Sequence, residues 1–157
     1  MSKLDLKHYL RHEDRLNNVQ YNSQLVTLFP FMLPQSIWET EIYDGTWTYF
    51  DDIPIGWRKA FGWEMACELR DAAEADKLED FYVIQIKEKF GELRFYTSET
   101  SEKVEAIIRK YEDLSRKTCV ECGKPAKFIS TGWICPWCED CIKKVHDQFV
   151  PISMGIE

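Results

Sequence analysis

Apolar side chains recur at helical spacing between Gly56 and Asp76. Residues three or four positions apart lie on the same face of an α-helix, so this repeat gathers the apolar side chains into one stripe. We therefore predict a helix that packs one face against a hydrophobic core. Its inward positions are Trp57, Phe61, Met65, Leu69, Ala72 and Ala73.

Two segments on either side of Asp44-Gly45 predict a β-hairpin. They are Ile37–Tyr43 and Thr46–Phe50. Asp-Gly favours a two-residue hairpin turn because both positions tolerate positive φ angles. The expected register separates a mainly apolar face from a polar one. The mainly apolar face would carry Trp38, Thr40, Ile42, Trp47 and Tyr49.

A second hairpin is predicted from Phe81–Ile86 and Glu92–Tyr96, with a turn near Lys89-Phe90-Gly91. A further helix is expected after Ser101, because apolar residues again recur at helical spacing. Its inward positions would be Val104, Ile107, Ile108, Tyr111 and Leu114.

The first segment, Leu4–Leu28, mixes charged and apolar residues and is expected to form one or two helices. Pro30 and Pro34 should end it, because a proline disfavours helical geometry in the residue before it. Together these elements predict an α+β fold: an antiparallel sheet of two hairpins with helices on one face, followed by a cysteine-rich module. We expect residues 1–117 to form the α+β domain, with a helical segment at 1–35, and residues 118–157 to form the module.

The composition is that of a chain able to build one core. Of its 157 residues, 45% are hydrophobic and 14% aromatic, which suffices for one main domain and a small metal-stabilised unit. Crossing a lipid bilayer takes about 20 consecutive apolar residues, and no stretch approaches this length. The first residues are charged and do not follow the pattern of a secretory signal, so a cytoplasmic location is expected.

The net charge of −7 is unevenly distributed. Residues 1–102 carry 11 basic and 19 acidic side chains, whereas residues 103–157 carry 9 and 8. The acidic N-terminal part is therefore not expected to bind phosphate backbones in general. The C-terminal part offers a local basic face, although acidic residues are interleaved with its basic ones.

Five of the six cysteines lie between Cys119 and Cys141. A reducing cytoplasm disfavours disulfides, so this clustering indicates a metal site. Cys119 and Cys122 form the first pair, but the second is ambiguous because Cys135-Pro-Trp-Cys138 overlaps with Cys138-Glu-Asp-Cys141. The two arrangements leave 12 or 15 residues between the pairs. A tetrahedral zinc site uses four ligands, so one cysteine is left over in either case.

We favour the 15-residue spacing. It allows a short hairpin within residues 127–134 and a helix that begins at Cys141 and runs toward Phe149. The N-terminus of that helix would stabilise the thiolates of Cys138 and Cys141. The result would be a treble-clef-like module around one structural zinc ion, because four thiolates leave no open coordination position for catalysis. The alternative, with Cys135 as a ligand and Cys141 free, stays open. The favoured ligands are Cys119, Cys122, Cys138 and Cys141.

Several short motifs carry a resemblance to known proteins. They are Gly56-Trp57, the segment Lys-Glu-Lys-Phe-Gly-Glu-Leu-Arg-Phe-Tyr at 87–96, Thr-Cys-Val-Glu-Cys-Gly at 118–123, Gly132-Trp133 and the final pair Cys138 and Cys141. In these motifs the chain resembles an uncharacterised family of short bacterial and bacteriophage proteins with a C-terminal four-cysteine zinc module. The match covers roughly residues 50 to 145. The resemblance places Cys135 at a position that is not a ligand in the family, and it implies no enzymatic activity.

The leading functional hypothesis is a zinc-stabilised, non-enzymatic protein that binds another protein. The resemblance to phage proteins implies a regulator or inhibitor of a host protein, including an anti-defence factor. Acidic side chains close to aromatic ones would suit a basic cleft on such a partner. They are Glu39, Glu41, Asp44, Asp51 and Asp52.

Two alternatives belong to other classes. A nucleic-acid-binding zinc protein would stack bases on Trp133 and Trp137 and contact phosphates with the lysines of the module. Those lysines are Lys124, Lys127, Lys143 and Lys144. A thiol redox protein would use Cys135 and Cys138, whose Cys-Pro-Trp-Cys sequence resembles a glutaredoxin motif. The glutaredoxin fold needs strands and helices after this motif. We therefore expect that the protein is not an enzyme.

Overall fold

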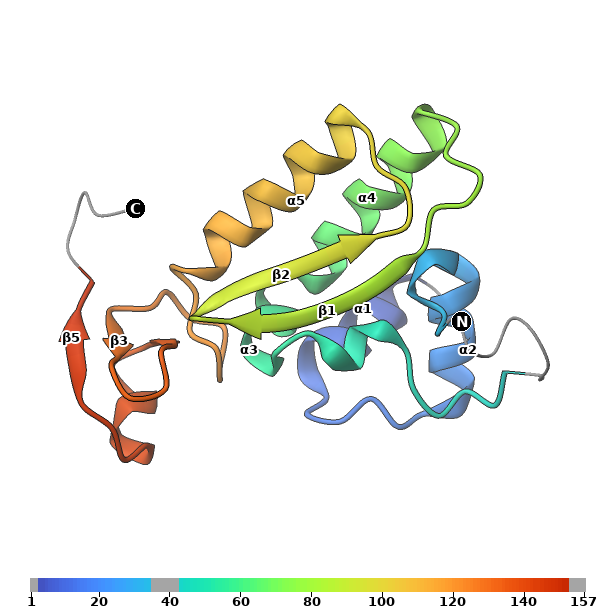
Figure 1. The fold of residues 1–157 in the computed structure, drawn as a ribbon. Helices are drawn as coiled ribbons and strands as arrows, with labels where there is room; N and C mark the ends of the chain where they lie inside the picture. The colour runs from blue at the N-terminus through green and yellow to red at the C-terminus, as the bar shows by residue number, and fades with distance from the viewer. Residues whose placement is uncertain (1–2, 35–42, 153–157) are drawn as a thin grey trace.

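The computed structural model describes residues 3–34 and 43–152 as a mixture of helices and two small antiparallel sheets (Figure 1). One sheet has two strands, β1 and β2, and lies in the body of the protein. The other has three strands in the order β4-β3-β5 and lies in the C-terminal part. The predicted combination of helices with antiparallel sheet is therefore present. None of the described helices is long and apolar enough to cross a membrane.

The N-terminal segment forms two helices, α1 (Lys3–His12) and α2 (Val19–Leu28), followed by the 3-10 helix η1 (Pro30–Met32). Asn18 caps α2, because its side-chain oxygen accepts a hydrogen bond from the Tyr21 N–H at 2.9 Å. The prediction of helices that end at the proline-containing stretch is confirmed.

Arg58 fastens α1 to the central helical segment. Its buried guanidinium donates hydrogen bonds to the carbonyl oxygens of Leu10 at 2.5 Å, Glu13 at 2.8 Å and Asp14 at 3.2 Å. Carbonyl groups at the end of a helix have no partner within the helix, and a positive charge there also suits the helix dipole. Arg58 thus satisfies the C-terminal end of α1 from a distant part of the chain.

The first predicted hairpin is wrong in its second half. Its first strand, Ile37–Tyr43, lies outside the described residues except for Tyr43. The second, Thr46–Phe50, runs into a 3-10 helix, η3 (Tyr49–Asp52). The reason is a local capping box. Thr48 Oγ1 accepts from the N–H of Phe50 at 3.1 Å, and the carboxylate of Asp51 accepts from the Thr48 N–H at 2.9 Å. These side chains offer the backbone a local alternative to strand pairing.

The predicted central helix is confirmed and runs without a break from Ile55 to Ala75. It comprises α3 (Ile55–Trp57), a π-helical segment η4 (Arg58–Gly62) and α4 (Trp63–Ala75). All of its predicted inward positions are buried.

The second predicted hairpin is also confirmed, as β1 (Val83–Lys89) and β2 (Glu92–Thr97). Phe90 and Gly91 form the turn with φ angles of 54° and 79°, which is the combination of a two-residue hairpin turn. The helix α5 (Glu102–Ser115) follows, and α4 and α5 lie on the same side of the two strands (Figure 1). Ser115 of α5 also accepts the N–H of Leu93 at 2.9 Å, so the helix closes the free edge of β2 at that point.

The C-terminal part holds β3 (Phe128–Ser130), β4 (Pro136–Trp137), the 3-10 helix η5 (Cys141–Lys144) and β5 (Phe149–Pro151). The central strand β3 pairs with β4 on one side and β5 on the other.

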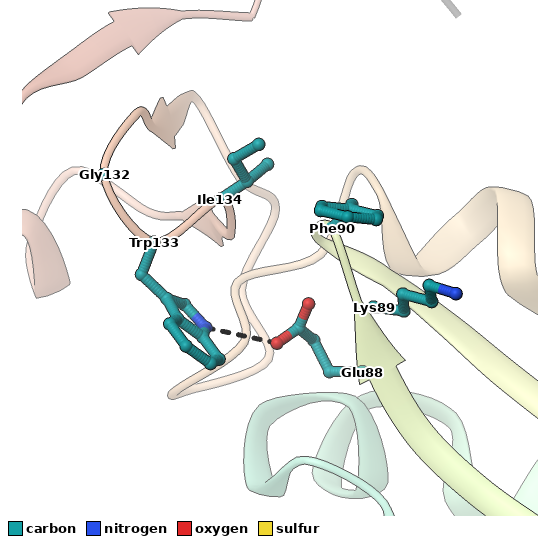
Figure 2. A pocket seen from close by; sticks show the side chains of 6 residues that line it. All are labelled: Glu88, Lys89, Phe90, Gly132, Trp133 and Ile134. Carbon is teal, nitrogen blue, oxygen red and sulfur yellow. Dashed lines mark hydrogen bonds between the residues drawn. The ribbon is translucent and has the colours of Figure 1, made fainter.

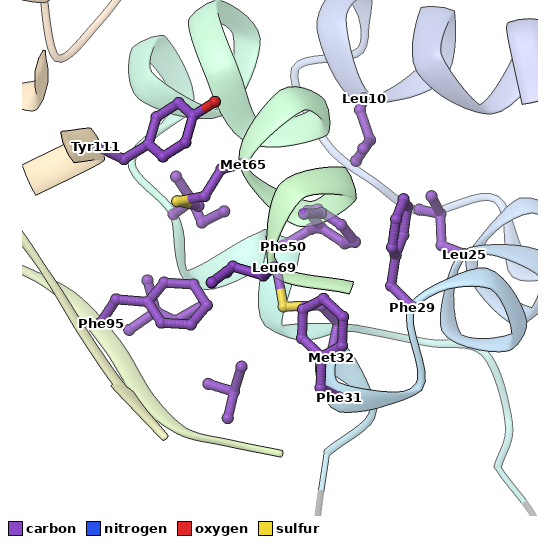
Figure 3. Packing of buried hydrophobic residues seen from close by; sticks show 14 of the residues in the cluster. Leu10, Leu25, Phe29, Phe31, Met32, Phe50, Met65, Leu69, Phe95 and Tyr111 are labelled. Atoms are coloured by element: carbon purple, nitrogen blue, oxygen red, sulfur yellow. The ribbon is translucent and has the colours of Figure 1, made fainter. Parts of the chain in front are cut away.

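The main core is built from buried side chains of α1, α2, α4 and α5, of η3, and of the β1–β2 sheet (Figure 3). Its largest fully buried side chains include Trp57, Phe29, Phe50, Leu10, Leu25, Met32, Met65 and Leu69. The second cluster, in the C-terminal part, consists of cysteines with Trp137 packed against them. That part of the chain therefore buries little apolar surface of its own.

We predict that Arg58→Met lowers the free energy of unfolding by about 3 kcal/mol, because three carbonyl groups lose their charged donor. Chemical denaturation followed by circular dichroism measures this value. Lys59→Met is the matched control, since Lys59 pairs with the exposed carboxylate of Asp14 and its loss should change stability much less. Equal losses in the two variants would contradict the role assigned to Arg58.

Candidate metal centre

Four cysteine sulfur atoms gather in the C-terminal part of the protein. Each lies within 4.8 Å of the others. A tetrahedral site with metal–sulfur bonds of about 2.3 Å would place its sulfur atoms about 3.8 Å apart. Three of the four cysteines are buried and the fourth, Cys122, is half-buried. The group is therefore positioned to hold a metal ion. Its members are Cys119, Cys122, Cys138 and Cys141.

The first pair sits in a tight turn. The N–H of Gly123 donates to the carbonyl of Cys119 at 3.1 Å, and the Cys119 N–H donates to the carbonyl of Lys124 at 2.8 Å. Gly123 has a φ of +85°, a left-handed geometry that residues with a side chain rarely adopt. Glycine at this position therefore lets the chain close the turn that carries Cys119 and Cys122.

The second pair begins a single helical turn. The N–H of Cys141 points at the sulfur of Cys138 with a separation of 3.4 Å, and η5 follows. The expected longer helix toward Phe149 is wrong, because Val145 is already extended. The chain after η5 instead leads into β5, and just before that strand the carbonyl of Gln148 accepts the N–H of Thr131 at 2.8 Å. Strand pairing with β3 satisfies backbone groups that a helix would otherwise have satisfied internally.

The expected hairpin within residues 127–134 is longer than predicted. It comprises β3 and β4, and its loop contains Trp133 and Cys135.

Cys135 lies outside the four-cysteine group. Its N–H donates to Ser130 Oγ at 3.0 Å, and its carbonyl accepts the Ser130 N–H at 3.0 Å. Burial raises the pKa of the Cys135 thiol to about 12, and the nearby Glu88 carboxylate adds to the shift. The structure thus groups the cysteines of the 15-residue spacing and leaves Cys135 as a protonated, buried thiol.

The four grouped sulfur atoms influence one another. Burial opposes ionisation of Cys138, but the N–H of Cys141 and the neighbouring thiols outweigh it and lower the Cys138 pKa to about 7. Burial and the sulfur atoms of Cys138 and Cys122 raise the pKa of Cys141. Four thiols at this separation do not all ionise at neutral pH by themselves. A bound divalent cation would hold them all as thiolates, so this donor set fits a thiophilic metal.

The first cysteine turn packs directly against the start of the central helix. The N–H of Gly56 donates to the carbonyl of Val120 at 2.8 Å, and Trp57 Nε1 donates to the carbonyl of Thr118 at 2.9 Å. A Cβ atom on Gly56 would lie 2.1 Å from the carbonyl oxygen of Cys119. Glycine is thus required at position 56 because another backbone occupies the space of a side chain.

A second contact joins the tip of the β1–β2 hairpin to the β3–β4 loop. Trp133 Nε1 donates to Glu88 Oε1 at 3.1 Å, and Gly91 lies against Ile134. The loop itself is held by Asp147, whose carboxylate accepts the backbone N–H groups of Gly132 and Trp133.

The hairpin tip and the β3–β4 loop together line a cavity of about 270 Å³ (Figure 2). Phe90 and Trp133 are 71% and 72% exposed, although both are large aromatic residues. We call the surface formed by Glu88, Phe90, Trp133 and Ile134 the seam. Sequence reasoning did not find it, since Phe90 was assigned only to a turn and Trp133 was grouped with Trp137. A phenylalanine at the tip of a two-residue turn, where small or polar residues are usual, was the available signal.

Some of the residues expected to bind nucleic acid have partners within the chain. Trp137 packs against the cysteine cluster, and its Nε1 donates to Ser130 Oγ at 3.0 Å. Two of the four lysines pair with acidic neighbours. These pairs are Lys124 with Asp140 at 3.4 Å and Lys127 with Glu139 at 3.5 Å.

The acidic residues expected to face a partner are not all available for that role. Asp51 caps η3, and Asp44 Oδ1 accepts the N–H of Thr46 at 3.0 Å. Glu39 and Glu41 lie outside the described residues.

No family model matches the chain, and neither curated proteins nor solved structures show a significant match to it. The resemblance noted from the sequence motifs therefore stays a prediction.

We predict that Gly56→Ala weakens the attachment of the cysteine turn and lowers the free energy of unfolding by about 3 kcal/mol, because the new methyl group overlaps a backbone carbonyl. Thermal unfolding of the metal-loaded protein measures the loss. Gly62→Ala is the matched control, since its added methyl group would meet the side-chain Cγ of Arg58 at 3.3 Å and not a backbone atom, and alanine favours a helix. If Gly56→Ala unfolded at the same temperature as the unaltered protein, the close packing at Gly56 would not matter for stability.

Proposed function

We propose that this chain is a zinc-stabilised, non-enzymatic binding protein that recognises a protein partner through the seam. The observation that carries the proposal is the exposure of Phe90 and Trp133 around one cavity, although they come from segments far apart in the sequence. Large exposed aromatic residues gain free energy when a partner covers them, and aromatic residues are enriched among the side chains that dominate binding energy.

Zinc is the metal that best suits the four-cysteine group. Four thiolates in a tetrahedral arrangement are the usual ligand set of structural zinc, and such a site has no open position for water or substrate. A tight cysteine turn, a short hairpin and a second cysteine pair at a helical turn together support a treble-clef-like arrangement. Zinc would supply folding free energy to a segment whose own core is small.

The preorganised geometry of the seam supports binding. Trp133 is held by its indole hydrogen bond to Glu88 and by the contact of Asp147 with its backbone N–H. Phe90 stands at a hairpin turn whose backbone is fixed by the Gly91 N–H bond to Glu88 Oε2 at 2.8 Å. The Trp133 side chain is therefore already held in place and would lose little conformational entropy when a partner binds.

A redox function through Cys135 and Cys138 is less well supported. An active thiol needs a lowered pKa, whereas burial raises that of Cys135 to about 12. Cys138 belongs to the metal-binding group. The narrower proposal, a regulator or inhibitor of a host protein, rests on the resemblance to phage proteins and on the acidic net charge of −7.

We predict one zinc ion per chain by elemental analysis. Cys135→Ser should keep full occupancy, whereas Cys141→Ser should lose the metal and expose the chain after Thr118 to protease, because a structural zinc site contributes several kcal/mol to folding. The two variants are matched, since each replaces one buried sulfur in the same part of the protein. Loss of zinc in Cys135→Ser with retention in Cys141→Ser would instead support the 12-residue spacing.

The binding function is tested by affinity capture from a lysate of the cells in which the gene occurs, using the unaltered chain and Trp133→Ala. We predict a stoichiometric protein partner whose affinity falls by roughly 30-fold in the variant, equivalent to about 2 kcal/mol. Tyr96→Ala, which removes an aromatic residue that is exposed outside the seam, should bind normally. A partner retained equally by all three proteins would show that binding occurs elsewhere, and the absence of any stoichiometric partner would count against the proposed function.

A further inference from the structure

The cavity of the seam has a carboxylate between two aromatic rings. Figure 2 shows Glu88 between Trp133 and Phe90, while the amino group of Lys89 points away from Glu88. Glu88 is held in place, because Oε1 accepts from Trp133 Nε1 at 3.1 Å and Oε2 accepts from the Gly91 N–H at 2.8 Å. Cys135 also forms a side-chain hydrogen bond with Glu88. A carboxylate offers about four lone-pair sites, so Glu88 can accept one more donor.

Glu88 and the two aromatic rings attract a cation, and the amino group of Lys89 already lies 6.0 Å from the centre of the Phe90 ring. An incoming cation would displace this exposed amino group from the ring. The faces of aromatic rings are electron-rich and attract positively charged groups. Asp147 adds a second carboxylate, which is hydrogen-bonded to the backbone of the loop that carries Trp133. Its pKa is lowered by hydrogen bonds from the backbone N–H groups of Trp133, Gly132 and Gln148, so it stays ionised at neutral pH. The net charge of −7 gives the whole chain a long-range attraction for basic partners.

We propose that the seam binds an arginine side chain of the partner protein, with the guanidinium against the rings of Trp133 and Phe90 and paired with the carboxylate of Glu88. Arginine suits this cavity better than lysine because its planar guanidinium stacks on aromatic faces and forms directed hydrogen bonds to a carboxylate. The inference rests on the proposed function, since it names the chemistry by which the seam recognises its partner.

The inference is tested without knowing the partner. The ¹⁵N-labelled, zinc-loaded chain is titrated with N-acetyl-arginine amide in about 150 mM salt, where long-range attraction between exposed charges is largely screened. The indole N–H resonance of Trp133, assigned from its loss in Trp133→Phe, reports binding. N-acetyl-citrulline amide is the matched probe, because it has nearly the same shape and no charge. We expect a saturable shift with the arginine compound and at least tenfold weaker binding of the citrulline compound.

Three variants locate the interaction. Glu88→Gln removes the charge but keeps an oxygen that can accept the indole N–H, and Phe90→Ala removes one ring from the surface. Each should weaken arginine binding by at least fivefold. Glu105→Gln removes a carboxylate from the exposed side of α5 and should leave binding unchanged. Zinc content and the dispersion of the amide spectrum show that each variant is folded.

Equal binding of the two probes, or unchanged arginine binding in both Glu88→Gln and Phe90→Ala, would overturn the inference. A stronger, saturable shift of Trp133 with a ten-residue oligothymidylate than with the arginine compound would also overturn it, in favour of nucleic acid. These outcomes are distinct from failure of the proposed function. A protein partner that depends on Trp133 but shows no arginine preference at the seam would leave the function standing and reject the arginine site.

Discussion

The structure depends on the close backbone contact between the first cysteine turn and the start of the central helix. Gly56 lets the two backbones meet, and Gly123 closes the turn on the other side of the contact. Trp57 links the two regions directly, because its ring is buried in the main core while its indole N–H reaches the carbonyl of Thr118. The four-cysteine group, which is positioned to hold a metal ion, is thereby attached to the part of the protein that has a large apolar core.

This attachment also creates the seam. With the cysteine turn fixed on the central helix, the β3–β4 loop comes to rest at the tip of the β1–β2 hairpin, where Gly91 meets Ile134 and Trp133 bonds to Glu88. Neither the hairpin nor the loop would hold Phe90 and Trp133 across a common cavity by itself. A metal that orders the C-terminal part would therefore support the binding proposed for the seam without itself contacting a partner.

The errors of the sequence reasoning have identifiable physical causes. Thr46–Phe50 has the alternation of a strand, but the capping box of Thr48 and Asp51 offers nearer hydrogen-bond partners than a second strand. The segment after Cys141 was expected to be helical, yet it pairs with β3 as β5. Strand pairing depends on a partner strand some twenty residues away in the sequence. The spacing of apolar residues within the segment itself carries no information about that partner.

The sequence alone determined the features that depend on local spacing. The helix over Ile55–Ala75, the β1–β2 hairpin and the left-handed Gly123 follow from periodicity, turn chemistry and the Cys-x-x-Cys pattern, all of which act within a few residues. Only the tertiary structure decided which of five neighbouring cysteines stays apart, why position 56 has no side chain, and that Phe90 and Trp133 share a surface. Those outcomes arise from contacts between distant segments, whose free energies depend on how the whole chain packs.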